Sequence, residues 1–282
     1  MTGMGSLLLQ VLLEAVKITS LVLAMMVLVD LANVAAKGRF RTAIQGGVWR
    51  QYLLASFLGA TPGCLGAFVT VSLYAHGGLS FGALVAGMIA TAGDEQFVML
   101  AMFPGQALAL FALLFATGLL FGWLADRLAS RVHLRPSPKC GLEAYHPQEE
   151  SGRHYLRHHL WEHLVRRHLG RVFLWTFGTL LVLQLGLHWW DLKGFVGGHM
   201  TWVWMLSGLV GIIPESGPHL AFVMLYAQGL VPFSVLFTSS FVQDGHGLLP
   251  LLSCSVRDAV LLKGFVLACG LALGGALYGL GW

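Results

Sequence analysis

Charged side chains are scarce in this sequence, and their scarcity decides the class of protein. Of its 282 residues, 11% are charged and 56% are hydrophobic, and the mean hydropathy is +0.73. A soluble domain typically carries about a quarter charged residues. The composition therefore excludes an ordinary soluble domain and predicts an integral membrane protein that has membrane lipids as partners.

Two kinds of motif are also missing. No GxxxxGK[ST] sequence occurs, so nothing in the chain supports direct use of ATP. The four cysteines form no CxxC pair, and Cys64, Cys254 and Cys269 lie in apolar segments, where a free cysteine behaves as a small hydrophobe. We therefore expect no disulfide bonds.

The N-terminus shows no basic stretch followed by a cleavage site, so residues 6–34 are expected to be a retained span.

The basic residues are concentrated in two loops. Thirteen of the 17 Lys and Arg residues lie within residues 37–50 and 127–171. Basic loops on one side of the membrane follow the positive-inside rule. The pI near 9.0 therefore reports orientation and not a nucleic-acid partner. We expect both loops to be cytoplasmic, in a multi-pass protein of the inner membrane with its N-terminus outside.

The rest of the chain consists of long apolar blocks, most of them as long as the roughly 20 residues that a spanning helix needs. There are eight, at residues 7–36, 51–75, 79–104, 107–127, 171–189, 201–227, 231–253 and 259–282.

The second half of the chain repeats the first. A shift of 152 residues lays residues 211–247 over residues 59–95 without a gap, with Pro62 on Pro214 and Gly93 on Gly245. The sequence therefore predicts a first transmembrane repeat at 1–129, a His-rich basic cytoplasmic loop at 130–170, and a second transmembrane repeat at 171–282.

The charge pattern predicts that the two repeats are inverted. If both basic loops are cytoplasmic, the first block of the second repeat crosses the membrane in the direction opposite to that of the first block of the first repeat. Each repeat must then cross an odd number of times, so one of its four blocks must enter and return on the same side. The best candidates are the blocks broken at 59–63 and 211–214, which hold Gly and Pro. We predict an all-α polytopic membrane protein with two inverted repeats, broken or re-entrant helices and about ten helical elements. The alternative is eight ordinary helices with proline kinks.

Carboxylates inside these apolar blocks are the first candidates for function. Between residues 51 and 125 the only formally charged side chains are Asp94 and Glu95, and between residues 194 and 256 they are Glu215 and Asp244. An ionisable group at membrane depth must be paired or must face a water-filled cavity. Interrupted helices of inverted repeats that meet near the midplane are the architecture of secondary transporters.

Two histidines accompany these carboxylates. Glu215 and His219 are spaced i,i+4, so a helix that starts after Pro214 would place both on one face. His246 lies in the break at residues 244–246 and matches Asp94 in the repeat. Carboxylate oxygens and imidazole nitrogens suit Mn, Fe, Co, Ni or Zn. We therefore predict one asymmetric metal site on the pseudo-two-fold axis.

A further set of residues is assigned secondary roles. Asp30, Cys64 and Gln243 are secondary or proton-coupling candidates. The central loop offers His154, His158, His159 and His163, whose i,i+4 pairs could capture a metal. The alternative for this loop is a basic amphipathic helix that lies on the cytoplasmic leaflet.

Four segments, GATPGCLGAF, TAGDEQFVM, GIIPESGPHLAFVMLYAQG and SFVQDGHGLLPLL, resemble the ten-helix heavy-metal exporters, which are also labelled manganese transporters or arsenic-efflux-like permeases. The resemblance covers residues 51–104 and 201–253. It implies a metal-efflux permease. The six residues at the matching motif positions are Asp94, Glu95, Glu215, His219, Asp244 and His246.

From these observations we expect a secondary transporter, and not an enzyme, that exports a divalent transition metal. Mn²⁺ is favoured because thiolates are scarce at the breaks, and proton exchange is a candidate for the coupling. The metal is then the substrate, and no cofactor is expected.

The alternative is an intramembrane polyprenyl-diphosphate phosphatase, because PESGPHL resembles a hairpin of that enzyme class. The core stretches, however, hold no Arg or Lys to bind a diphosphate. An anion permease would have to explain four buried carboxylates, and self-association is left open.

Overall fold

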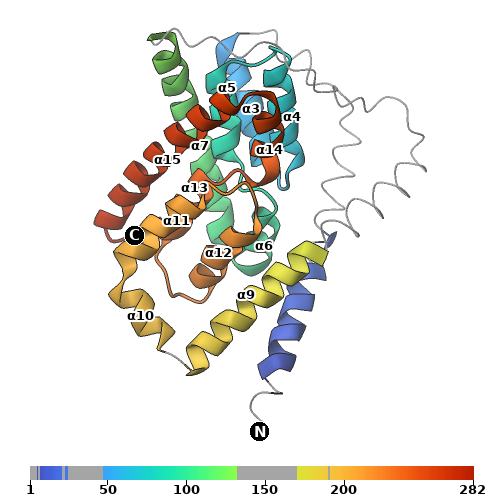
Figure 1. Ribbon diagram of the computed structural model, residues 1–282, viewed down its shortest axis with the longest axis vertical. Coiled ribbons are helices and arrows are strands. Elements are labelled where there is room, and N and C mark those ends of the chain that lie inside the picture. The colour runs from blue at the N-terminus through green and yellow to red at the C-terminus, as the bar shows by residue number, and fades with distance from the viewer. Residues whose placement is uncertain (1–4, 6, 21–22, 25–46, 132–169, 190) are drawn as a thin grey trace, which may run out of the picture.

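The computed structural model describes residues 5, 7–20, 23–24, 47–131, 170–189 and 191–282 (Figure 1). These residues form helices joined by turns, and no strand occurs among them. The stretches Phe81–Met102, Pro104–Arg131 and Val256–Gly279 are long and apolar enough to cross a membrane. The all-α polytopic fold is therefore confirmed.

The helices are named below with the labels of Figure 1, in chain order. In the first repeat they are α3 (Val48–Ala60), α4 (Leu65–Ala75), α5 (Phe81–Ala90), α6 (Glu95–Met102) and α7 (Pro104–Arg131). In the second they are α9 (Gly170–Trp189), α10 (Leu192–Gly198), α11 (Met200–Val210), η3 (Gly217–His219), α12 (Leu220–Ala227), α13 (Phe233–Val242), η4 (Gly245–Gly247), α14 (Leu248–Cys254) and α15 (Val256–Gly279).

The helix boundaries repeat with the same offset as the sequence. A shift of 152 residues carries both ends of α5 onto the two ends of α13, and it carries both ends of α4 onto the start of η3 and the end of α12. The start of α7 likewise falls on the start of α15. The internal repeat is therefore a structural one.

The two repeats run in opposite directions. Near the end of α7, the Asp126 carboxylate accepts a hydrogen bond from the backbone N–H of Gly82 at the start of α5, 2.6 Å away. At the end of α4, only a short turn before α5, the Tyr74 hydroxyl donates to Asp258 at the start of α15, 2.8 Å away. The end of α7 and the start of α15 therefore lie on the same face of the molecule, which is the upper one in Figure 1. Because α7 and α15 correspond in the repeat, the repeats are inverted.

Each repeat contains two breaks, and each break follows from local backbone chemistry. In the first repeat, α3 ends before Pro62 and Gly63, and α5 is separated from α6 by a turn at Gly93. Gly63 and Gly93 have φ of +101° and +59°, a region that residues with a β-carbon rarely adopt. Helices α4, α5 and α6 have 11, 10 and 8 residues, so none can span a bilayer alone.

These breaks decide between the two architectures that the sequence left open. Several residues outside helical conformation separate α3 from α4, and α3 packs against α4 across the break. The alternative of eight continuous helices with proline kinks is therefore wrong.

Helix α5 is the buried centre of the first repeat. All ten of its residues are buried, and α3 and α7 pack on it through glycines. A β-carbon on Gly122 of α7 would lie 2.6 Å from the carbonyl oxygen of Gly82, and one on Gly118 would lie 2.7 Å from that of Ala86. Small residues that allow backbones to approach this closely are a common way to pack helices in lipid.

Two sequence predictions are wrong. No helix starts directly after Pro214, and η3 begins only at Gly217. A helix that began at Glu215 would need the N–H of residue 218 for its first hydrogen bond, and Pro218 has none. The expected absence of disulfides also fails, since Cys254 at the end of α14 is disulfide-bonded.

Replacement of Gly122 by Ala should destabilise the fold, because the new methyl group meets the backbone of α5. We expect a loss of about 1–3 kcal/mol, the usual effect of overpacking. Gly264→Ala on α15 is the matched control, since nothing lies within 4 Å of its added carbon. Thermal unfolding of the purified variants in detergent measures both, and the close-packed interface would be refuted by equal melting temperatures.

Candidate metal site at the crossing of the two repeats

The pseudo-two-fold axis passes between two corresponding glycines. A β-carbon on Gly93 would lie 3.3 Å from the α-carbon of Gly245, and one on Gly245 would lie 3.3 Å from the α-carbon of Gly93. Equivalent residues can touch only where a symmetry axis passes between them. Any larger residue at either position would have to push the two breaks apart, so glycine is required here both for its φ and for the close approach.

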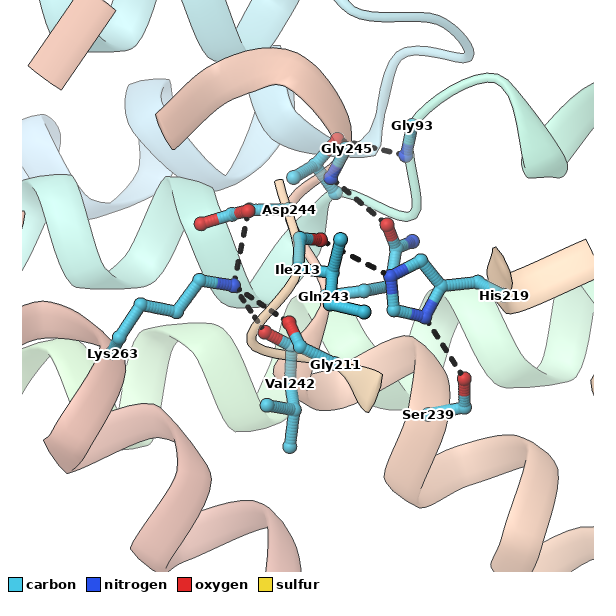
Figure 2. Close-up of polar contacts among 11 residues, drawn as sticks. Gly93, Gly211, Ile213, His219, Ser239, Val242, Gln243, Asp244, Gly245 and Lys263 are labelled. Atoms are coloured by element: carbon cyan, nitrogen blue, oxygen red, sulfur yellow. Dashed lines mark hydrogen bonds and ion pairs between the residues drawn. The ribbon is translucent and has the colours of Figure 1, made fainter. Parts of the chain in front are cut away.

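The two glycine turns are held in the same way. The backbone N–H of Gly93 donates to the hydroxyl of Thr91 at 3.2 Å, and that of Gly245 donates to the amide oxygen of Gln243 at 2.9 Å (Figure 2). Thr91 and Gln243 correspond in the repeat. Gln243 therefore supports the backbone of the break, and its assignment as a proton-coupling residue stays a prediction.

Three side chains converge beside this crossing. Ligand atoms of Cys64, Asp94 and His246 all lie within 4.8 Å of one another, and all three residues are buried. The Cys64 thiol donates to Asp94 Oδ1 at 3.4 Å and lies 3.6 Å from His246 Nδ1. One sulfur, one oxygen and one nitrogen within this distance can bind a single divalent ion.

The group lies on the symmetry axis. Asp94 and His246 occupy corresponding positions in the two repeats, and the fold brings them to one place. The equivalent of Cys64 is Ser216, whose buried hydroxyl has no hydrogen-bond partner among the described residues. A β-carbon on Gly93 or Gly245 would lie 3.1 or 3.2 Å from this hydroxyl oxygen, so Ser216 also faces the crossing.

Glu215 contacts the histidine of this group, and its predicted role as a metal ligand stays a prediction. One of its carboxylate oxygens lies 3.4 Å from His246 Nε2, the ring nitrogen that points away from Cys64. A carboxylate on one imidazole nitrogen leaves the other free as a metal ligand and fixes the ring. The side chain of Glu215 is 33% exposed, so it marks the more open side of the site.

Asp244 is engaged elsewhere. Its carboxylate oxygen lies 3.0 Å from Nζ of Lys263, a residue of α15 that also donates to the carbonyl oxygens of Gly211 and Val242 (Figure 2). Asp244 was predicted as a metal ligand, but the structure places it in a buried ion pair. Lys263 was not among the predicted site residues, although it is the one lysine of the last apolar block in the sequence.

His219 is also held apart from the three converging side chains. It is fully buried, with Nε2 3.3 Å from the carbonyl oxygen of Ile213 and Nδ1 3.5 Å from the Ser239 hydroxyl (Figure 2). The prediction that Glu215 and His219 share a helix face is wrong, because Glu215 lies in the break and His219 lies within η3. Both ring nitrogens of His219 have protein neighbours, and its role as a ligand stays a prediction.

Glu95 is the remaining predicted ligand. It begins α6, is 1% exposed, and neither of its carboxylate oxygens has a hydrogen-bond partner among the described residues. The side chain of its neighbour Gln96 is likewise buried and unpartnered. The structure does not place Glu95 with Cys64, Asp94 and His246, so its role stays a prediction.

Five candidates lie outside the described residues. They are Asp30 and the loop histidines His154, His158, His159 and His163.

Comparison with known families agrees with this architecture. A family model described as "Putative, 10TM heavy-metal exporter" matches residues 6–169 and 171–278. The chain belongs to this family. Neither the comparison with curated proteins nor that with solved structures finds a match. Together with the apolar helices, membership identifies a multi-pass membrane protein of a transporter family, as the sequence motifs implied.

Asp94→Asn and His246→Ala should abolish binding of a divalent metal to the purified protein, because each removes one of the three converging ligand atoms. Calorimetric titration with Zn²⁺, Co²⁺ and Mn²⁺ measures the loss. Glu215→Gln should weaken affinity about 10–100-fold, the usual effect of removing an orienting carboxylate.

His219→Gln is the matched control for these variants. It removes a buried histidine of the same repeat that does not reach the three ligand atoms, so its metal affinity should stay near that of the wild type. Loss of binding in His219→Gln with retention in His246→Ala would reverse the assignment.

Proposed function

We propose that this protein is a secondary transporter that exports a divalent transition-metal ion, held during transport by Cys64, Asp94 and His246. The supporting observation is that two equivalent residues of the inverted repeats meet, with a thiol, at the crossing of the broken helices. A site on the axis between two inverted repeats is where alternating access needs it, because each repeat can open toward one side of the membrane.

The three donor atoms of the site change which metal we expect to be preferred. From the sequence, Mn²⁺ was favoured because thiolates were scarce at the breaks. With the Cys64 sulfur beside Asp94 and His246, the set has one soft, one intermediate and one hard donor. Such a mixture favours Zn²⁺ or Co²⁺ over Mn²⁺, which prefers oxygen ligands. We therefore propose a Zn²⁺-like ion as the preferred substrate and retain Mn²⁺ as the competing one.

Three protein ligands leave the coordination of a tetrahedral ion incomplete. An incomplete site suits a transporter, because an ion that is bound too completely would be released slowly. The buried Ser216 hydroxyl and water are the remaining ligands within this proposal.

Proton exchange is the proposed coupling. Thiol, imidazole and carboxylate bind metal only when deprotonated, so loading the site releases protons and protonation of the site releases metal. We further propose that the basic loops face the cytoplasm of the cell that holds the protein in its inner membrane, following their charge.

Transport by the purified protein in liposomes tests the proposal directly. Wild-type protein should carry Zn²⁺ or Co²⁺ down a gradient and move protons in the opposite direction, which trapped metal and pH indicators record. Metal affinity should fall as the pH is lowered, because protons compete for the same three atoms.

Asp94→Asn should be inactive in this assay, and Glu215→Gln should be slow. His199→Ala, which changes an exposed histidine at the end of α10, should transport normally. Transport that survives both Asp94→Asn and Glu215→Gln would refute the site.

Selectivity should follow the pair Cys64 and Ser216, which are equivalent in the two repeats. Cys64→Ser makes both positions hydroxyl and should shift the preference toward Mn²⁺ by about tenfold or more. Ser216→Cys makes both positions thiol and should shift it toward Zn²⁺ and Cd²⁺. Competition between two metals in the liposome assay measures the ratio, and an unchanged ratio in both variants would remove Cys64 from the ligand set.

A further inference from the structure

A lysine is buried in the part of the molecule where charges are rarest. Lys263 lies within α15, and its side chain is 8% exposed. Its Nζ lies 3.0 Å from Asp244 Oδ1 and donates to the carbonyl oxygens of Gly211 at 2.9 Å and Val242 at 2.8 Å (Figure 2). An ammonium group has three N–H donors, and here it meets three oxygens. Two of these contacts are hydrogen bonds to carbonyl oxygens, and the third is the ion pair with Asp244.

The oxygens of Asp244, Gly211 and Val242 together form a negatively charged pocket that suits a cation. Val242 is the last residue of α13, and Gly211 caps the end of α11. Carbonyl groups at helix C-termini have no partner within the helix and carry the negative end of the helix dipole. The Asp244 carboxylate, 3% exposed, adds a full negative charge at the same point.

The first repeat lacks this arrangement altogether. Phe111 and Ala92 stand at the positions that correspond to Lys263 and Asp244, and both are buried. The end of α5, which corresponds to the end of α13, is therefore built there without an ion pair. The fold of a repeat therefore does not require the ion pair. The pair between Lys263 and Asp244 is a specific feature of the second repeat.

The pair joins the two segments that carry the open side of the metal site. Gly211 opens the break that continues to Glu215, and Asp244 precedes His246 by two residues. Glu215 and His246 are in contact with each other at 3.4 Å. A cation that binds both segments fixes their separation.

We propose that Asp244 and the carbonyl groups of Gly211 and Val242 form an intramembrane monovalent-cation site of the alkylammonium class, occupied in the native protein by Lys263 itself. Lys263 is then a positioning residue for Glu215 and His246. The site needs no cation from solution, because the chain supplies its own. The proposal does not depend on which metal is exported.

Chemical rescue of Lys263→Ala tests this site. The substitution removes the atoms of n-propylammonium and leaves their space beside Asp244. The melting temperature of the purified variant in choline chloride should fall by roughly 10 °C, as expected when one partner of a buried ion pair is lost. n-Propylammonium chloride should restore most of that fall, relative to wild-type protein in the same salts, whereas choline has no N–H donors and should not.

Lys263→Met is the matched control, because its side chain fills the same space without a charge. It should be destabilised, and n-propylammonium should not restore it. A Lys263→Ala variant that melts like the wild type, or one that n-propylammonium does not restore, would overturn the proposal. Equal restoration of Lys263→Ala and Lys263→Met would overturn it as well.

A double variant covers the case in which Lys263→Ala does not fold. Asp244→Asn with Lys263→Met removes both charges, so it should be more stable than Lys263→Met alone, in which a buried carboxylate is left unpaired. A double variant that is less stable than Lys263→Met would show that Asp244 does not depend on the lysine. Metal titration of Lys263→Ala with and without n-propylammonium provides the functional readout, and its affinity should recover with the amine.

Discussion

A chain that leaves the helical conformation inside a bilayer must find hydrogen-bond partners for its backbone within the protein. The structure meets this constraint by placing the breaks of the two repeats against each other. Gly93 and Gly245 touch across the symmetry axis, and each turn is held by a side chain two residues earlier. The short helices on either side depend on this crossing, because none of them could span the membrane or stand alone in lipid.

Symmetry provides the framework of the site, and departures from symmetry provide its chemistry. The equivalent positions 94 and 246 carry a carboxylate and an imidazole, and the equivalent positions 64 and 216 carry a thiol and a hydroxyl. A site on a two-fold axis built from identical residues would have paired ligands of one kind. Here each pair supplies two different donors, so a small number of side chains forms a mixed ligand set.

Two buried carboxylates at the helix breaks, Asp94 and Asp244, have different surroundings. Asp94 lies with Cys64 and His246, and His246 also contacts the partly exposed Glu215. Asp244 is closed off by Lys263 and two carbonyl groups. Both are carboxylates at a helix break, and only their neighbours in space distinguish a candidate metal ligand from a member of a buried ion pair.

Much of the fold could be predicted because its causes are local. Glycine and proline interrupt a helix through their own backbone preferences, so their repeated spacing predicted the breaks and the duplication. The two basic loops predicted the inversion. The presence of Asp94 and His246 at one site also followed, since they correspond in the repeat. The helix expected after Pro214 failed because a second proline, Pro218, delayed the helix start and separated Glu215 from His219.

The sequence by itself determined that this is a duplicated membrane protein with rare polar groups at its helix breaks, because composition and backbone preference act residue by residue. Only the tertiary structure decided which polar groups meet. Cys64 lies with Asp94 and His246 in the candidate metal site, and Lys263 pairs with Asp244 apart from it, through contacts between segments far apart in the chain. Partners of this kind depend on how helices pack, and spacing along the sequence does not encode them.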